Sequence, residues 1–176
     1  AKFLDTQISI FIKDFVKNSE FSGSSGFVKL EQLLRCKPLS RKEACWHWKK
    51  RRILLEETIL ARGDSYNGYP VSKGYFGSYC FDGLAMALWA LYHSSNYADC
   101  ILKVVNLLGD CDTTAAIAGQ VAGAFYGYVS IEKTEMGKIF MRNLRSWDPF
   151  EEIALKALML HEDAAGTSTL ASIKNN

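Results

Sequence analysis

The stretch NLLGDCDTTAAIAGQVAGAFYG, residues 106–127, decides the fold and poses the main question about this chain. Two acids, Asp110 and Asp112, stand one residue apart after a glycine, and a run of alanines and glycines with almost no charge follows them. Like charges repel, so a pair of carboxylates at the mouth of a tightly packable segment needs a physical reason. Either the acids cap a helix, or they hold a metal ion.

The residues after the two acids are those of a closely packed helix. Gly119, Gly123 and Gly127 recur at every fourth position, which leaves one face of a helix without side chains. In a membrane such a stripe is a dimerisation motif, but the apolar run here is too short and contains Gln120. We therefore expect a central helix that the backbones of neighbouring elements approach closely.

The acidic pair itself admits two interpretations. Free N–H groups at a helix start accept one carboxylate as a cap, which would leave the second acid and Thr113 unexplained. Mg²⁺ takes carboxylates, hydroxyls and water in octahedral geometry, and D-x-D-T supplies three oxygen ligands from one turn. Acidic turns are common, so the pattern alone leaves both alternatives open: a metal turn, or Asp112 as a cap with Asp110 solvated.

Helical patterns dominate the first third of the chain. Residues 4–18 place four apolar side chains on one face at helical spacing: Ile8, Phe11, Ile12 and Phe15. Ser40 and Glu43 have the spacing of a capping box, which predicts a helix running to about Leu60. The basic run KKRR, residues 49–52, would then lie on a solvated face of that helix.

Helical signals continue in the second half. Residues 82–93 and 97–108 predict two helices, the second of them capped by Ser95 or Asn96. Asp148 has the position of an N-cap before a further helix. No alternating strand pattern of useful length occurs, so we predict an all-α fold.

A broken segment, residues 63–77, separates the two helical halves. It holds four glycines, a proline and four aromatic residues, which is typical of an ordered loop. The RGD triplet at its start is too short to indicate adhesion. Asp82 follows the loop closely and is interpreted either as a second-shell partner of a site or, as we prefer, as a first-turn acid favoured by the helix dipole.

Composition excludes several classes of protein. The chain has 176 residues, 48% of them hydrophobic, and a net charge of +2, which suits one domain with a core and gives no nucleic-acid or membrane footprint. No apolar run reaches the roughly 18 residues that span a bilayer. The cysteine count is odd, without C-x-x-C, so free thiols are expected and with them a cytoplasmic or other reducing intracellular compartment. The cysteines are Cys36, Cys45, Cys80, Cys100 and Cys111.

The stretch VNLLGDCDTTAAIAGQVAGAFYG resembles the carboxyl-terminal signature of the ADP-ribosylglycohydrolase family, which includes the dinitrogenase-reductase-activating glycohydrolases and the ADP-ribosylhydrolases of eukaryotes. The family pattern is a G-D-x-D-[ST] turn that enters an Ala/Gly-rich helix. The preceding stretch ARGDSYNGYPVSKGYFGSYCFDGLAMALWALYHSSNYADC is also similar to one branch of the family. Together the resemblance runs from about Trp46 to Gly127, and on through WDPFEEIALKAL.

This resemblance implies an all-α fold around two Mg²⁺ ions, which position a ribose and activate water to cleave the glycosidic bond between ADP-ribose and a protein side chain or other acceptor. Carried over by motif, Asp110, Asp112 and Thr113 would be metal ligands. The substrate-binding residues would be Gly77, Ser78 and Tyr79, at the adenosine end of the ligand. The implied partner is ADP-ribose or an ADP-ribosylated protein.

The chain also departs from the family pattern. Members carry a T-D-D-[ST] turn near their amino end that supplies further metal ligands, and no such turn occurs here. Leu108 stands where many members have a second glycine, and would crowd the turn. We therefore expect a fold incomplete at the amino end: residues 1–161 as the carboxyl-terminal portion of the helical domain, and residues 162–176 as a flexible tail.

The chain contains only about half of the metal ligands that the family pattern implies, and three hypotheses about its function follow. The chain is a hydrolase that requires a missing amino-terminal half; or it is a catalytically inactive pseudoenzyme, a structural or interaction subunit of a larger assembly; or it binds ADP-ribose or a nucleotide without hydrolysing it. In each case Mg²⁺ binding to this chain alone would be weak or absent. Another chain or a missing segment would cover the exposed core, so we predict that the chain is not an independent monomer.

Overall fold

The computed structural model describes residues 2–20, 23–156 and 159 of the chain. The tail predicted at residues 162–176 lies outside these described residues. Backbone contacts divide the chain into two compact units, Ala1–Ile131 and Glu132–Asn176. The prediction of one helical portion over residues 1–161 stays a prediction.

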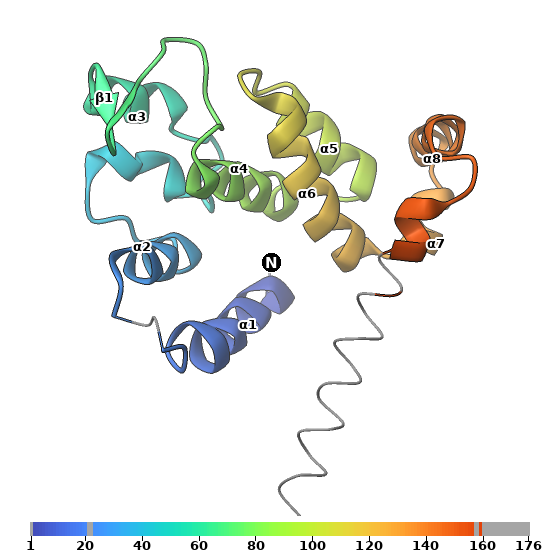
Figure 1. The fold of residues 1–176 in the computed structure, drawn as a ribbon, viewed down its shortest axis with the longest axis horizontal. Coiled ribbons are helices and arrows are strands. Elements are labelled where there is room, and N and C mark those ends of the chain that lie inside the picture. The colour runs from blue at the N-terminus through green and yellow to red at the C-terminus, as the bar shows by residue number, and fades with distance from the viewer. Residues whose placement is uncertain (1, 21–22, 157–158, 160–176) are drawn as a thin grey trace, which may run out of the picture. The chain divides into compact units, whose positions relative to one another are not determined.

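The first unit is built mainly of helices, and residues 63–79 form a longer connection that carries a small hairpin (Figure 1). In chain order its elements are α1 (Lys2–Phe11), the π-helical turn η1 (Ile12–Val16), α2 (Ser25–Leu34), the 3-10 helix η2 (Arg41–Trp46), α3 (Leu55–Arg62), α4 (Cys80–Tyr92), α5 (Tyr97–Val105) and α6 (Cys111–Tyr126). A short helix, α7 (Tyr128–Glu132), follows, and α8 (Glu135–Trp147) belongs to the second unit. The all-α fold class is confirmed.

A two-residue hairpin is the only sheet in the described part of the chain. Its strands, β1 (Ser65–Tyr66) and β2 (Tyr69–Pro70), pair antiparallel across a turn at Asn67 and Gly68. Both turn residues have positive φ, 52° and 83°, which is the conformation that an Asn-Gly pair supplies at least cost. The segment predicted as an ordered loop thus contains this small hairpin.

Helix α4 forms the centre of the first unit and packs against both α5 and α6. Its sequence is apolar on nearly every side, and Ala85, Met86 and Ala90 are fully buried, as expected for a helix surrounded by others. The boundaries predicted for α4 and α5 are confirmed to within a few residues, and of the two predicted caps Asn96 is the one used, accepting from the Asp99 N–H at 2.9 Å.

The glycine face of α6 meets side chains rather than backbones, which corrects our expectation. A Cβ placed on Gly119 would lie 3.4 Å from the Tyr97 hydroxyl and 3.8 Å from Ile101 Cδ1, both on α5. The large Tyr97 side chain fills the groove that the missing side chains leave, so the two backbones need not touch. Gly127 is not part of this face: it ends the helix with a φ of 74°.

The predicted amino-terminal helix is present as α1 and η1, but its buried face differs from the predicted one. Phe11 and Phe15 are 44% and 54% exposed and stack on each other, with ring centroids 5.1 Å apart. The buried side chains recur at every fourth residue instead: Leu4, Ile12 and Val16, with Ile8 partly buried. The π-helical turn, which has more residues per turn than an α-helix, keeps Val16 on the same face as Ile12.

The helix predicted between residues 40 and 60 is wrong, because the chain breaks at residues 47–54 into η2 and α3. Trp46 and Trp48 are both fully buried. Residues two apart on a helix point to different sides, and the break after Trp46 lets both indoles reach the core of this unit. The basic run at residues 49–52 therefore lies in a turn and not on a helix, and its residues are exposed.

The capping box predicted at the same helix does not form. The Ser40 hydroxyl accepts from the Lys42 N–H at 3.1 Å, while the Glu43 carboxylate accepts from the Tyr66 hydroxyl at 2.7 Å. Glu43 is buried and has non-helical backbone angles, so its side chain turns inward instead of back to Ser40. A tertiary contact has replaced the local one.

The second unit contains α8 and the start of a further helical segment. Thr134 caps α8 by accepting from the Gly137 N–H at 3.0 Å. The prediction of Asp148 as the N-cap with the helix starting at Pro149 is wrong, because the helix starts at residue 152, although the Asp148 carboxylate still accepts from the N–H groups of Glu152 and Ile153. The positive φ of Glu151, 54°, delays the start.

Two further predictions concern the chain as a whole. All five cysteines lie in the described part of the chain and are free, as expected. Among the described residues, no helix has both the length and the apolar character needed to cross a membrane.

Candidate active site

The D-x-D-T turn stands where α6 begins. Asp110 occupies the N-cap position, but its carboxylate makes no capping hydrogen bond. Asp112 lies in the first turn, exposed, and its carboxylate accepts from the N–H of Thr113 at 2.9 Å. The turn is held instead by Thr114, whose buried hydroxyl donates to the Asp110 carbonyl at 2.9 Å. Capping therefore uses one oxygen of the Asp112 carboxylate, and the Asp110 carboxylate does not act as a cap.

The two carboxyl groups lie next to each other. The pKa of Asp112 is below its ordinary value, first because its carboxylate accepts from the Thr113 N–H and second because it shares a hydrogen bond with the Asp110 carboxyl. Carboxylates this close repel each other, and a shared proton or a bound cation would relieve the repulsion. With the Thr113 hydroxyl beside them, the start of α6 offers three oxygen ligands from one exposed turn.

The turn is locked from behind by the segment that precedes α4. The Asp110 N–H donates to the Phe76 carbonyl at 2.7 Å, and Gly109 adopts a φ of 68°. A Cβ on Gly109 would lie 2.4 Å from the Phe76 carbonyl oxygen, closer than real Cβ atoms come. Only glycine fits this position, which explains why the acids follow one.

Leu108 does not crowd the turn, contrary to our expectation. Its φ is 62°, in the left-handed region that glycine prefers, so a second glycine would suit this backbone. Its side chain is 68% exposed and points away from the packed segments. Leucine in place of glycine at position 108 therefore strains the backbone but does not cause a steric clash.

The predicted substrate-binding residues lie against the predicted metal turn. Gly77 has a φ of 106°, and a Cβ on it would lie 2.7 Å from Thr114 Cγ2. Gly83 allows α4 to approach the backbone of Gly77 closely, because a Cβ at position 83 would lie 3.3 Å from the Gly77 carbonyl oxygen. The structure thus brings residues 77–79 and residues 110–114 together, although about 30 residues separate them in the sequence.

A cavity of about 580 Å³ opens beside residues 77–79. Five of its thirteen lining residues are aromatic, Ser72 and Ser78 contribute hydroxyl groups, and its only charged lining residues are Arg62 and Asp82. The aromatic lining residues are Tyr66, Tyr69, Tyr75, Phe76 and Tyr79. A wall of this kind fits a flat, uncharged ring with a few polar edges.

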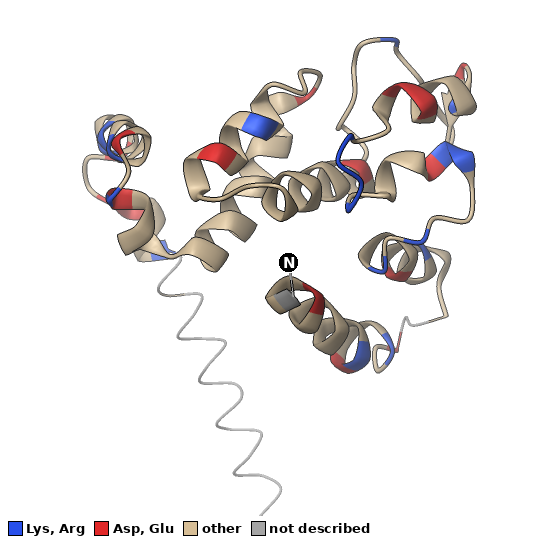
Figure 2. Cartoon of the chain, turned by 180° about the vertical axis from the view of Figure 1, so that it is seen from behind, with Lys and Arg blue, Asp and Glu red and all other residues tan. Residues whose placement is uncertain are grey.

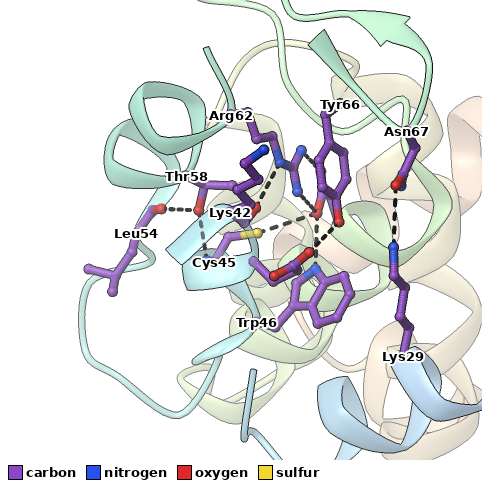
Figure 3. A network of polar contacts seen from close by, with 11 residues as sticks. Lys29, Lys42, Cys45, Trp46, Leu54, Thr58, Arg62, Tyr66 and Asn67 are labelled. Carbon is purple, nitrogen blue, oxygen red and sulfur yellow. Dashed lines mark hydrogen bonds and ion pairs between the residues drawn. The ribbon is translucent and has the colours of Figure 1, made fainter. Parts of the chain in front are cut away.

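Arg62 and Asp82, which both line this cavity, form a buried ion pair, and Figure 3 shows the polar network around Arg62. The two guanidinium nitrogens donate to the two carboxylate oxygens at 2.5 and 2.8 Å. Trp46 Nε1 also donates to the same carboxylate, at 3.0 Å, and Cys45 Sγ lies 3.4 Å from it. Asp82 is therefore not merely a first-turn acid favoured by the helix dipole, because it is the centre of a buried network.

The network extends to Tyr66. The Arg62 guanidinium lies over the Tyr66 ring, 3.9 Å from its centroid, as the close-up shows (Figure 3). Burial raises the pKa of Tyr66, and the hydrogen bond to Glu43 raises it further. The Tyr66 hydroxyl therefore stays protonated and neutral. Because Arg62 is buried in this network, the RGD triplet that includes it does not present an adhesion motif.

Sequence reasoning missed this ion pair, although one signal pointed to it. Asp82 is the only charged residue in the apolar helix CFDGLAMALWALY. A lone charge in a helix that is otherwise buried calls for a counter-charge from another element. The sequence did not indicate which of the 21 Lys and Arg residues supplies it.

Oxygen ligands for a hard cation are present in part. Asp110, Asp112 and Thr113 supply two carboxylates and a hydroxyl, which is about half of an octahedral shell. Among the described residues no group of three or more His, Cys, Asp or Glu side chains could hold a metal ion. Beyond Asp112, α6 carries no charged residue, as the tan ribbon in Figure 2 reflects. The donor set fits Mg²⁺ that keeps water or takes further ligands from elsewhere.

Comparison with known proteins gave one family and several relatives. The family model for ADP-ribosylglycohydrolase matches residues 14–168. ADP-ribosylarginine hydrolase Tri1 of Serratia proteamaculans is 44% identical over 61 residues, which is 35% of this chain and 17% of that protein. The protein of the same name from Pseudomonas putida is 53% identical over 49 residues, or 28% of this chain and 13% of that protein.

A third relative belongs to a different named activity. The ADP-ribosyl-[dinitrogen reductase] glycohydrolase of Rhodospirillum rubrum is 34% identical over 70 residues, 40% of this chain and 24% of that protein. The matched stretches thus span a quarter or less of each of these relatives. No solved structure matches the chain significantly.

Proposed function

This chain belongs to the ADP-ribosylglycohydrolase family, and we propose that it takes part in hydrolysis of the glycosidic bond that links ADP-ribose to a protein side chain. The observation that carries the proposal is the contact of Phe76 and Gly77, at the start of one predicted segment, with Asp110 at the start of α6. The two segments that the resemblance assigns to substrate and metal are thus packed together, with glycines at the closest approaches.

In this proposal Asp110, Asp112 and Thr113 hold magnesium. A bound Mg²⁺ ion supplies charge stabilisation at the sugar and lowers the pKa of a water. The chain's own contribution is to fix where those oxygens point: the Phe76 carbonyl holds the Asp110 N–H, and the Thr114 hydroxyl holds the Asp110 carbonyl. The positive end of the α6 dipole also favours both carboxylates as anions.

The aromatic cavity would take the adenosine end of the ligand. Tyr79 and Tyr66 present rings to it, and the Ser78 hydroxyl is exposed at its rim. The cavity carries no net charge, because Arg62 and Asp82 neutralise each other. An uncharged base would therefore lie here, with the pyrophosphate nearer to the start of α6.

We take the acceptor to be arginine, because two of the relatives are named as ADP-ribosylarginine hydrolases. Complete hydrolytic activity would need metal ligands in addition to the two described acids at the turn. We propose that another chain or a segment outside the described residues supplies them. The alternative function, a catalytically inactive interaction subunit, is favoured by the same observation, since half a ligand set can be all that a pseudoenzyme retains.

Release of ADP-ribose from a protein ADP-ribosylated on arginine tests the proposal. The assay compares this chain with a longer one that carries a T-D-D-T turn, with Mg²⁺ and with EDTA. We expect release only from the longer chain with Mg²⁺, and its loss in Asp112→Asn. Asp14→Asn, an exposed acid of η1, is the matched control and should keep full activity.

Each outcome of this assay decides between the candidate functions. Release by the present chain alone would refute the need for outside ligands. Release that persists in EDTA would refute the metal role of the turn. No release from either chain, on arginine or on any other ADP-ribosylated acceptor, would favour the inactive subunit.

A further inference from the structure

The Arg62–Asp82 pair joins elements that are distant in the sequence. Asp82 lies at the start of α4, and all its side-chain partners come from η2 or α3. Arg62 also donates through Nε to the Lys42 carbonyl at 2.8 Å. Three hydrogen bonds thus fix the plane of the guanidinium, which a lysine ammonium could not reproduce.

The fixed guanidinium is surrounded by three rings. Its Cζ atom lies 3.9 Å from the ring centroid of Tyr66, 5.6 Å from that of Phe76 and 5.9 Å from that of Tyr79. Phe76 and Tyr79 flank the segment that approaches the acidic turn. The cation therefore holds both ends of that segment through the faces of their rings.

Phe76 connects the guanidinium to the acidic turn directly. Its ring is buried and lies near Arg62, while its carbonyl accepts from the Asp110 N–H at 2.7 Å. Its backbone is also the group that Gly109 must approach so closely. A shift of the Phe76 ring would thus move the hydrogen bond that orients Asp110.

Tyr79 provides a second connection, through α4. The Tyr79 carbonyl accepts from the N–H groups of Asp82 and Gly83 at 2.9 and 3.0 Å. Its ring packs edge-on against Tyr66, with centroids 5.4 Å apart. The start of α4, whose Asp82 side chain binds Arg62, therefore also holds the Tyr79 carbonyl through its backbone N–H groups.

We propose that Arg62 and Asp82 are positioning residues, which hold the segment from Phe76 to Tyr79 in place and through it orient the Asp110–Thr113 turn. Both act through Phe76, and Tyr79 provides the second connection through α4. The catalytic meaning of this positioning rests on the proposed function. The mechanical coupling between the buried pair and the turn can be measured without any ligand.

Hydrogen exchange at single amides tests the coupling in the full chain. In Arg62→Lys, which keeps the charge but loses the planar contact, we expect the Asp110 amide to exchange at least tenfold faster. The amides of α5 and of the middle of α6 should keep their exchange rates, because the global fold is retained. Phe76→Leu breaks the ring contact without disturbing a buried charge, and we expect the same local effect.

Trp48→Phe is the matched control. It removes a buried indole hydrogen bond, from Trp48 Nε1 to the Leu33 carbonyl at 2.7 Å, at a place that does not contact the cavity wall. In Trp48→Phe the exchange rate of the Asp110 amide should not increase more than the rates of other amides in the chain. If Arg62→Lys proves unable to fold, Phe76→Leu alone decides the question.

The outcomes separate this inference from the proposed function. Unchanged exchange at Asp110 in Phe76→Leu, or an equal acceleration in Trp48→Phe, would overturn the inference. If neither this chain nor the longer one releases ADP-ribose, but the variants show faster hydrogen exchange only at the Asp110 amide, the hydrolase function is refuted and the coupling is supported. If ADP-ribose is released but hydrogen exchange at the Asp110 amide is not selectively faster, the hydrolase function is supported and the coupling is refuted.

Discussion

The two charged groups of this site differ in how their charge is balanced. The Arg62 and Asp82 side chains are only 5% and 2% exposed, carry opposite charges and satisfy each other within the protein. Asp110 and Asp112 carry like charges at the open start of α6, and among the described residues no Lys or Arg pairs with either. The buried pair is complete, whereas the exposed pair lacks a cation.

This difference separates a structural group from a ligand-binding one. A buried charge is tolerated only with its partner in place, so the Arg62–Asp82 pair resists change. Exposed carboxylates stay hydrated and contribute little to the free energy of folding. They are free to bind a cation from solution, which is what the proposed metal turn requires.

The largest expected effect is on the buried pair. Asp82→Ala leaves the Arg62 guanidinium buried without a counter-charge, and should lower the free energy of unfolding by about 3–5 kcal/mol. Urea denaturation measures the loss. Asp112→Ala is the comparison and should leave the free energy of unfolding close to that of the wild type, because its side chain is exposed. If Asp82→Ala and Asp112→Ala lost the same free energy of unfolding, the buried pair would not differ from the acidic turn in its contribution to stability.

The next effect concerns the backbone beneath the exposed pair. Gly109→Ala should lower the free energy of unfolding by about 2–3 kcal/mol, because positive φ and the contact with the Phe76 carbonyl both oppose a Cβ. In Gly74→Ala the φ is also positive, 77°, but the space is open. That control should lose only about 1 kcal/mol. If the two losses were equal, the close packing behind the turn would be refuted.

Leu108→Gly should have a smaller effect of the opposite sign. Removing the left-handed strain gains about 1–2 kcal/mol, and the extra freedom of glycine in the unfolded chain costs about 0.5–1 kcal/mol. A net stabilisation of about 0.5 kcal/mol is expected in thermal denaturation. Leu102→Gly, the same change within α5, should instead destabilise by about 1 kcal/mol.

The smallest effect is on the titration of Asp112. Its carboxyl should titrate below about 3.9 by NMR, because the Thr113 N–H and the Asp110 carboxyl stabilise the anion. Its contribution to stability is therefore present above that pH and is lost as the pH falls through the lowered pKa. Asp110→Ala should raise the pKa of Asp112 toward the ordinary value. An unchanged pKa would contradict the shared hydrogen bond.

Local patterns predicted the helices well and the connections between them poorly. Helices α4, α5 and α6 followed from their apolar spacing and from the cap at Asn96, which depend on neighbouring residues alone. The break between Trp46 and Trp48 did not, since only the surrounding core dictates that both indoles are buried. Helix α2, capped by Ser24, was also not predicted.

The site shows the same division. The D-x-D-T turn and residues 77–79 were identified by resemblance, and the structure places them in contact. Their roles as ligands and substrate contacts remain predictions. The Arg62–Asp82 pair joins residues 20 apart in the sequence, and no local rule selects one arginine among many for a lone buried acid.

The tryptophans give the first unit its own optical signal. Trp46 and Trp48 are fully buried there, whereas Trp147, at the end of α8, is 90% exposed. A buried indole emits at shorter wavelength than a hydrated one, so unfolding around the Arg62–Asp82 pair should shift the emission to the red while Trp147 adds a constant background. Trp46 donates its N–H to Asp82. Trp48 and Trp89 emit from the same unit, so a chain with phenylalanine at positions 48 and 89 would let Trp46 report changes at the buried pair without any added label.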